Sequence, residues 1–288
     1  MGYINQIMII LEEVCLGQFY FDTALLLRES IFLNGMLSSI EASYGLNKDD
    51  IEKFEVLDRI LLRKILSAHS KSPSESLYLE LGILPITYII KSRRLNFLHY
   101  ILNRPDNDLL KKFFNIQNKY PVKNDWVLTI QEDLELLGFP VNFEKIRTIK
   151  KNQFKKSIKE KVKMLAFQYL IKLKDDHTKM SNLSYDSLKI QSYFTSSKVS
   201  AKQAKSIFKF RTHMANVKEN FHFMYNETNL SCPDCHQTLD TQQHLLDHSD
   251  QDINQDKYLN MFRAGYHQDK VLLSRIMDQV LNRRPESS

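Results

Sequence analysis

Glycine and proline are scarce in this sequence, with only seven of each among 288 residues. Gly-looped α/β enzymes and β-sandwiches need these residues for phosphate loops and tight turns, so the scarcity disfavours both classes. Leucine, isoleucine and lysine are common instead, in patterns that favour helices. The sequence therefore predicts an all-α, mainly helical fold, with no sheet of more than two or three strands.

Cysteine is also rare. The three that occur, Cys15, Cys232 and Cys235, include one close pair and one isolated residue. This is not the even set of closely spaced cysteines that a disulfide framework requires. We interpret the pattern as that of a protein kept in a reducing compartment.

Long hydrophobic runs are absent. The apolar segment 7–11 has no basic residue before it and meets Glu12 and Glu13 at once, unlike a secretory signal. No stretch approaches the length of a membrane span, so we expect no membrane partner.

Catalytic motifs are missing as well. The sequence has no Gly-rich phosphate loop and no Gly-x-Ser-x-Gly elbow. Adjacent carboxylates occur at 49–50, where they suit the start of a helix, and at 175–176, where no hydrophobic strand precedes them as a polymerase site would require. We therefore expect no catalytic residues, no enzymatic activity and no small-molecule substrate.

Helical periodicity is present along most of the chain. Asn47 and Ser200 can cap helices, Pro85 can open one, and Gly82 and Gly138 can end two. A short helix should end near Gly82. The other predicted helices are 19–44, 47–65, 85–103, 109–119, 125–137, 144–173, 201–220 and a terminal hairpin at 254–284.

Changes in composition divide the chain into four segments. Residues 1–104 form a helical region, 105–199 a helical connector with a basic run, 200–250 a basic helix followed by a Cys-x-x-Cys segment, and 251–288 the terminal helices. We place the main boundary in the polar, Ser-rich stretch 174–199.

The cysteine pair belongs to a motif typical of zinc sites. Cys232 and Cys235 are followed by His244 and His248, in the spacing C-x2-C-x8-H-x3-H. Two thiolates and two imidazoles complete the tetrahedron that zinc prefers, and histidines four apart share one face of a helix. The short spacer indicates a compact knuckle, and four protein ligands leave no open position for catalysis.

Other interpretations of this motif remain open. A redox dithiol needs a surrounding βαβ pattern, which is absent, and the site could be an unmetallated relic. His248 is the least certain ligand, and His236 or Asp250 could replace it.

Positive charge is modest in total, at +6, but unevenly spread. Lysine and arginine dominate residues 145–163, and they alternate with phenylalanine on the helix before the cysteine pair, which suits phosphate contacts beside stacking rings. Either region could equally be a solvated helix face. Arg211 lies off the main row of lysines and could instead anchor its helix to the knuckle. The candidate nucleic-acid contacts are Lys205, Lys209, Arg211, Lys218, Arg93, Arg94, Lys151 and Lys155.

Several segments, taken in order, resemble one family. Residues 57–66 (LDRILLRKIL), 77–86 (LYLELGILPI) and 93–102 (RRLNFLHYIL) resemble the region after the catalytic palm in polyproteins of non-LTR, LINE-type retrotransposons. Residues 210–214 (FRTHM), 217–221 (VKENF), the CPDC pair and His244 resemble the C-terminal zinc-binding region of the same proteins. The resemblance implies a thumb-like helical region over 1–104, a connector and a zinc knuckle, which hold template RNA and target DNA during target-primed reverse transcription.

The sequence lacks two parts of this family and departs from its pattern at two positions. The palm, with its Tyr-x-Asp-Asp turn, has no counterpart in these residues, and neither does an endonuclease. Family members commonly have Cys where this chain has His248, which still supplies a ligand, and often Trp where it has Ser43, which suggests a drifting copy.

Two functions follow from these patterns. The first is a non-catalytic fragment that binds RNA and single-stranded or target DNA, carries zinc, and could act beside a full-length reverse transcriptase. The alternative is a zinc-stapled helical module with a structural or protein-interaction role and no nucleic-acid binding. A steep loss of affinity with salt favours the first.

Overall fold

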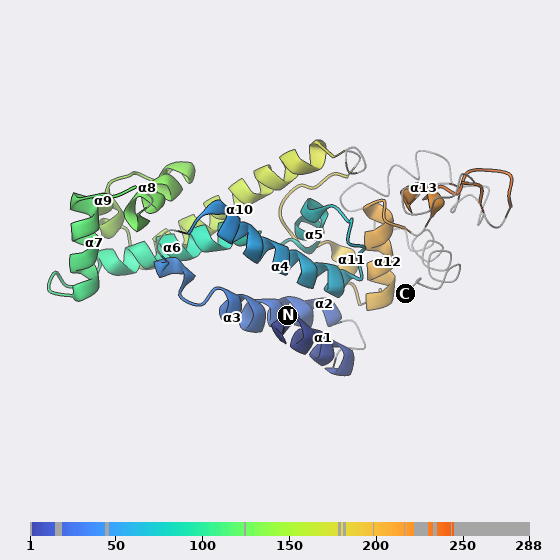
Figure 1. Cartoon of the computed structure of the whole chain (residues 1–288), viewed down its shortest axis with the longest axis horizontal. Coiled ribbons are helices and arrows are strands. Elements are labelled where there is room, and N and C mark those ends of the chain that lie inside the picture. The colour runs from blue at the N-terminus through green and yellow to red at the C-terminus, as the bar shows by residue number, and fades with distance from the viewer. Residues whose placement is uncertain are drawn as a thin grey trace. The chain divides into compact units, whose positions relative to one another are not determined.

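Helices account for every regular element that the structure describes (Figure 1). This computed structural model describes residues 2–14, 19–43, 46–123, 125–177, 180, 183–197, 199–215, 217–221, 230–232, 235–242 and 244. Strand pairing within these ranges is limited to two isolated antiparallel bridges, Leu81–Ile190 and Ser231–Leu239. The all-α prediction is confirmed.

The elements vary widely in length. In chain order they are α1 (Gly2–Val14), α2 (Tyr20–Leu27), a π-helical segment η1 (Arg28–Leu33), α3 (Asn34–Met36), a 3-10 turn η2 (Ile40–Ala42), α4 (Lys48–Leu66), α5 (Ser74–Leu81), α6 (Ile86–Leu102), α7 (Leu109–Lys119), α8 (Trp126–Leu136), α9 (Phe143–Thr148), α10 (Lys151–Asp175), α11 (Ser192–Thr195), α12 (Ala201–Arg211) and α13 (Lys218–Phe221). None of the described helices combines the length and apolar character that crossing a membrane requires.

The helix starts follow the capping residues that the sequence offers. The Asn47 side chain accepts a hydrogen bond from the Asp50 N–H at 2.9 Å before α4. Ser200 forms a reciprocal capping box with Gln203 at the start of α12. Gly82 adopts a left-handed conformation directly after α5. Each satisfies terminal backbone groups that the helix itself leaves without partners.

Three predicted helices are interrupted. The helix expected over 19–44 contains a π-helical segment and ends in a turn at 37–39, where Ser39 is left-handed. The helix expected over 144–173 breaks at Ile149, whose backbone is extended, and so divides into α9 and α10. The helix expected over 201–220 ends at Arg211. There His213 is left-handed and the Met214 N–H donates to the Lys209 carbonyl at 2.7 Å, the closure of a Schellman motif. The hairpin expected at 254–284 lies outside the described residues.

The chain forms two compact units. Unit 1 comprises residues 1–28, 60–83 and 170–288, and unit 2 comprises residues 29–59 and 84–169. The four segments expected from the sequence divide the chain along its length, whereas these units divide it in space, so the units do not test the predicted boundaries.

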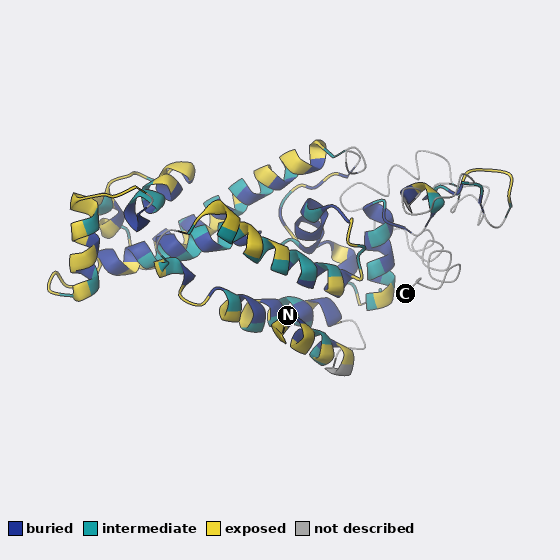
Figure 2. Cartoon of the chain, in the orientation of Figure 1, coloured by how far each residue is buried: buried dark blue, intermediate teal, exposed yellow. Residues whose placement is uncertain are grey.

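The core of unit 2 is built around α6. Leu95, Leu98 and Ile101 of this helix are buried in one cluster with Trp126 and Ile130 of α8. Figure 2 colours the helices by how far each residue is buried. Three buried residues of α10 join the same cluster: Phe154, Ile158 and Val162. The structure thereby fixes α6 and the first half of α10 in one body.

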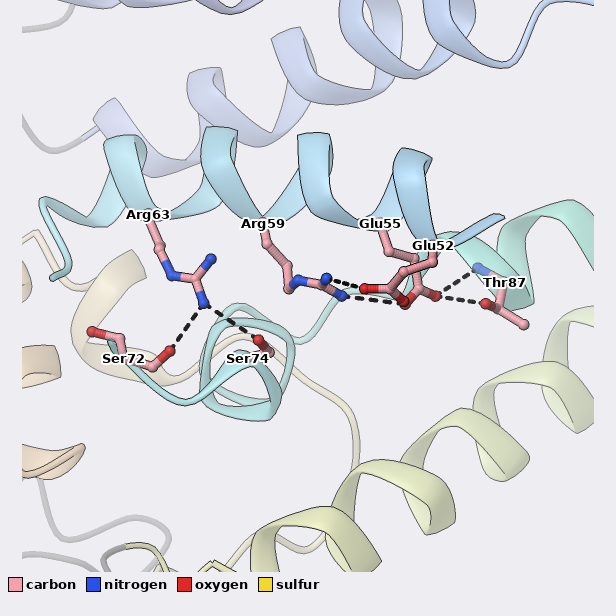
Figure 3. A network of polar contacts seen from close by, with 7 residues as sticks. All are labelled: Glu52, Glu55, Arg59, Arg63, Ser72, Ser74 and Thr87. Carbon is pink, nitrogen blue, oxygen red and sulfur yellow. Dashed lines mark hydrogen bonds and ion pairs between the residues drawn. The ribbon is translucent and has the colours of Figure 1, made fainter. Parts of the chain in front are cut away.

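A polar network links α4 to the start of α6 (Figure 3). Pro85 precedes α6 and provides no side-chain cap. Glu55 of α4 supplies the acceptor instead, and Thr87 donates to it from both its N–H, at 3.2 Å, and its hydroxyl, at 2.6 Å. Arg59 holds this carboxylate from the other side, because its guanidinium bonds Glu55 and Glu52.

Unit 1 encloses a buried acid. Glu80 of α5 is inaccessible to solvent and accepts hydrogen bonds from the Tyr185 hydroxyl at 2.7 Å and the Tyr193 hydroxyl at 2.6 Å. The Arg211 Nε completes the set at 3.0 Å. A buried carboxylate requires such partners, so these four residues, here called the Glu80 cluster, join α5 and α12 to the segment 185–193.

Candidate metal centre and cationic pocket

A short hairpin presents the two cysteines. The Cys232 N–H donates to the Thr238 carbonyl at 2.8 Å, and the Asp240 N–H donates to the Leu230 carbonyl at 2.9 Å. Between them the His236 N–H donates to the Cys232 carbonyl at 2.9 Å, and His236 is left-handed at φ 55°. This tight turn brings the two thiol groups to the same side.

The structure gathers three of the four predicted zinc ligands. The ligand atoms of Cys232, Cys235 and His244 all lie within 4.8 Å of one another, and the Cys235 Sγ is 3.3 Å from the His244 Nε2. Tetrahedral zinc with ordinary bond lengths places its sulfur and nitrogen ligands about 3.5 Å apart. The three residues therefore fit a zinc ion.

The chemistry of Cys235 also suits a metal. The Thr238 hydroxyl, 3.5 Å from the Cys235 Sγ, is the main reason that the pKa of this thiol falls to about 5, helped by the Gln237 backbone N–H. The group is then a thiolate at neutral pH, and the thiolate is the form that binds zinc. His248 and Asp250 lie outside the described residues, and His236 is exposed and does not join the group.

Buried polar side chains hold this hairpin against the segment that follows α12. The Gln242 Nε2 donates to the Phe210 carbonyl at 3.0 Å, and the Gln242 Oε1 accepts from the Asn220 Nδ2 at 2.8 Å. The Asp240 carboxylate accepts from the Lys218 N–H at 2.8 Å. Sequence reasoning missed Asn220, Asp240 and Gln242, because their partners lie about twenty to thirty positions away along the chain.

The predicted contacts on α12 have other partners. Arg211 is 3% exposed and anchors α12 to Glu80 of α5, so it is unavailable to a phosphate. The Lys205 Nζ lies 4.2 Å from the centre of the Tyr20 ring and donates to its hydroxyl at 3.2 Å. Lys209 of α12 and Lys218 of α13 are half-buried. These residues therefore do not form the row of exposed cations that the sequence suggested.

Arg94 requires the same correction. It is 5% exposed, and its guanidinium is paired with the buried carboxylate of Asp133 at 2.6 Å. Arg93, Lys151 and Lys155, by contrast, line one cavity of about 970 Å³ in unit 2. We call this cavity the cationic pocket, and six basic side chains line it: Arg93, Arg104, Arg147, Lys150, Lys151 and Lys155.

The electrostatic balance of the cationic pocket is strongly positive. Against the six basic groups, Glu41 is the one acidic residue in its lining. Arg104 is paired with Asp108 at 2.6 Å. Within the described ranges, Lys150, Lys151 and Lys155 are exposed and form no ion pair. Arg93 donates to the Leu37 carbonyl and the Asn34 side chain, and Arg147 lies 4.0 Å from Glu144. The three ammonium groups are therefore the exposed positive charge of the pocket that has no acidic partner among the described residues.

The start of α10 adds to this charge. The Lys150 carbonyl accepts from the Phe154 N–H at 2.9 Å, so the N–H groups just after it point out of the helix end. The first turn contains no acidic residue, although the positive end of a helix dipole favours one. Lys150 and Lys151 there oppose the dipole, at a cost of roughly 0.3–1 kcal/mol each, which a bound anion would relieve.

Aromatic side chains form another part of the pocket wall. The rings of Phe97 and Tyr100 are stacked, with centroids 6.1 Å apart and planes within 16° of parallel. The Arg104 guanidinium lies 5.3 Å from the Tyr100 ring centre. Tyr100 remains 48% exposed. Sequence reasoning did not select Tyr100, Arg104, Arg147 or Lys150, although the last two lie within the basic run that it identified.

His99 holds the junction between α9 and α10 in place. It is buried, its Nε2 donates to the Ile149 carbonyl at 2.8 Å, and its ring stacks on Phe154 at 5.2 Å. Ile149 is the residue at which the predicted helix breaks. His99 therefore fixes the junction that places Lys150 and Lys151 beside α6.

The chain was compared with protein families, curated proteins and solved structures. No protein-family model, no curated protein and no solved structure matches it. What the chain does is therefore inferred from its own residues.

Proposed function

We propose that this chain is a non-catalytic nucleic-acid-binding region of a LINE-type reverse transcriptase, carrying a structural zinc and lacking the polymerase palm. The observation that carries the binding proposal is the cationic pocket of unit 2, where three exposed lysines without ion-pair partners among the described residues surround the start of α10. The order of the segments that resemble the family supports the proposed origin.

The proposed ligands are RNA and single-stranded or target DNA. Lysine and arginine contacts to phosphates are independent of sequence, and they release counterions from the nucleic acid. Zinc, held by Cys232, Cys235, His244 and a fourth ligand, would fold the hairpin that follows α12, and it would take no part in chemistry. The absence of polymerase activity stays a prediction, which primer extension by the isolated chain would contradict.

A triple substitution in the pocket tests the binding proposal. Lys150→Gln, Lys151→Gln and Lys155→Gln together should reduce the slope of log affinity against log salt by about two on a single strand, at about 0.7 for each phosphate contact. Affinities measured by fluorescence anisotropy at several salt concentrations give this slope.

The matched control removes the same charge from elsewhere in unit 2. Lys112, Lys156 and Lys159 are exposed lysines outside the pocket lining, and their replacement by Gln should leave the slope nearly unchanged. Equal effects of the two triple variants would show a diffuse electrostatic effect. Wild-type protein that binds no polynucleotide at low salt would overturn the proposal.

A second candidate function is protein interaction, for which α7 gives the reason. Leu109, Phe113, Ile116 and Tyr120 are all at least 57% exposed. Their spacing places them on one side of the helix, opposite the buried Phe114. If the wild type fails to bind nucleic acid, the alternative is a helical module that binds another protein through this apolar stripe.

A further inference from the structure

Two different chemical surfaces face the same cavity in unit 2. Lys150, Lys151 and Lys155 come from the start of α10. Phe97 and Tyr100 come from the C-terminal half of α6, and Arg104 lies just after its end. The cavity volume of about 970 Å³ is at the upper end of the roughly 300–1,000 Å³ of small-ligand sites. A ligand that contacts both surfaces needs an anionic part and a flat part.

The lysine surface is suited to phosphate. Its three ammonium groups lie at a helix start whose free N–H groups and dipole also favour an anion. A peptide carboxylate would satisfy these groups equally well, so this surface alone does not identify the ligand.

The aromatic surface distinguishes a nucleotide from a peptide carboxylate as the ligand. Phe97, Tyr100 and Arg104 form a stack at the C-terminal end of α6, since the two rings are nearly parallel with centroids 6.1 Å apart and the guanidinium lies over the Tyr100 ring at 5.3 Å. Nucleobases add readily to aromatic rings and to guanidinium planes. With 48% of Tyr100 and 41% of the Arg104 side chain exposed, the stack retains surface on which a base can lie.

We infer that the cationic pocket holds an unpaired nucleotide of a single strand, with its base against Tyr100 and Arg104 and its flanking phosphates at Lys150, Lys151 and Lys155. The inference rests on the proposed function and specifies its ligand. Bases inside a duplex are stacked on their neighbours and cannot reach the aromatic surface. The pocket therefore selects single strands, and it tolerates any base because every base offers a flat face.

An abasic strand separates base stacking from phosphate binding. The probes are labelled oligo(U) and a length-matched abasic sugar–phosphate strand, both about twelve nucleotides long, within the site sizes of single-strand-binding folds. Wild-type protein should bind oligo(U) at least about fivefold more tightly than the abasic strand, since stacking of one base contributes roughly 1 kcal/mol or more.

Substitution at Tyr100 locates the effect. Tyr100→Ala should weaken oligo(U) binding about tenfold, leave abasic binding within about twofold, and leave the salt slope unchanged, because no cation is lost. Tyr100→Phe should retain binding. The matched control is Tyr120→Ala, which removes a similarly exposed ring outside the pocket and should have no effect.

A second measurement uses the unaltered protein, in case Tyr100→Ala unfolds. Ultraviolet crosslinking of oligo(U) carrying 4-thiouridine, followed by peptide mass analysis, should place the crosslink within residues 96–104. A crosslink confined to other segments would overturn the inference.

The outcomes distinguish the inference from the proposed function. Equal binding of oligo(U) and the abasic strand by wild type, with Tyr100→Ala unchanged, overturns the nucleotide inference but leaves phosphate binding intact. Tighter binding of a duplex than of oligo(U) overturns it as well. Failure of the wild type to bind either strand overturns the proposed function itself.

Discussion

Gly82 lies so close to a neighbouring backbone segment that no side chain larger than hydrogen fits there. A Cβ at this position would lie 2.0 Å from the Ile190 backbone N and 2.1 Å from the Lys189 backbone carbon, and the residue has φ +65°. Gly82→Ala should therefore lower the free energy of unfolding by more than about 2 kcal/mol, because backbone overlap adds to the left-handed strain. Urea denaturation followed by circular dichroism measures this change.

Gly138→Ala is the matched control for backbone strain alone. Gly138 has nearly the same φ, +62°, but an added Cβ would meet only the end of the Lys161 side chain, at 3.6 Å. The control should cost about 1–2 kcal/mol. Equal losses at the two positions would mean that the approach of 189–190 to Gly82 is not rigid.

Tyr88 gives unit 2 a dependence on alkaline pH. Burial raises its pKa to about 12, helped by the neighbouring Tyr169 and Glu55, whereas an unfolded tyrosine titrates near 10. Between these values the folded state retains a proton that the unfolded state loses, so the stabilisation is complete below about pH 10 and is lost as the pH rises through 12. Urea unfolding at pH 9 to 11.5 should therefore show stability falling less steeply in Tyr88→Phe than in wild type. Identical slopes would contradict the assignment.

Arg94 and Arg211 show that the sequence alone does not reveal whether an arginine is exposed or paired with a buried acid. Their guanidinium groups are paired with the buried acids Asp133 and Glu80, which lie 39 and 131 positions away along the chain. A buried carboxylate is stable only beside such a partner. Since the pairing depends on the fold, sequence reasoning counted Arg94 as surface charge, and it offered Arg211 as a phosphate contact or an anchor to the knuckle without identifying Glu80 as its partner.

At the scale of elements, local signals predicted the helices well. Asn47, Ser200 and Gly82 act within one turn of their own positions, so their capping roles follow from the sequence. The three breaks that were missed have other origins. Ile149 is held extended where a distant residue, His99, bonds its carbonyl. Ser39 and His213 occupy left-handed positions at which glycine or asparagine is usual.

The two candidate sites differed in how far the sequence could predict them. Cys232, Cys235 and His244 lie within thirteen residues, so their spacing alone predicts a shared ligand group. The lining of the cationic pocket comes from α3, η2, α6 and the residues just after it, and the α9–α10 junction. Packing of α6 against η2, α9 and α10 places these segments together, and no local pattern encodes it.

For the whole molecule, the metal group and the cationic pocket belong to different units. The cysteines lie in unit 1 and every residue lining the pocket lies in unit 2. Removing zinc with a chelator should therefore expose reactive thiols while leaving the salt-slope difference between wild type and the Lys150, Lys151 and Lys155 triple variant at about two. Thiol titration and anisotropy on the same samples measure both effects.

Restoring zinc provides the control for this experiment. Added zinc should protect the thiols again and leave the slope difference as it was. Loss of that difference on chelation, with recovery on adding zinc, would show that the metal also organises the pocket.

The Glu80 cluster has a consequence for the order in which the chain folds during synthesis. Arg211 follows Glu80 by 131 residues, which at roughly 5–20 residues per second is a delay of about 7–26 s. Until then Glu80 lacks its cation, and burying a carboxylate without a charged partner costs several kcal/mol. All residues of unit 2 have emerged from the ribosome once Tyr169 has. Unit 2 can therefore fold before the last segment of unit 1, residues 170–288, has been synthesised.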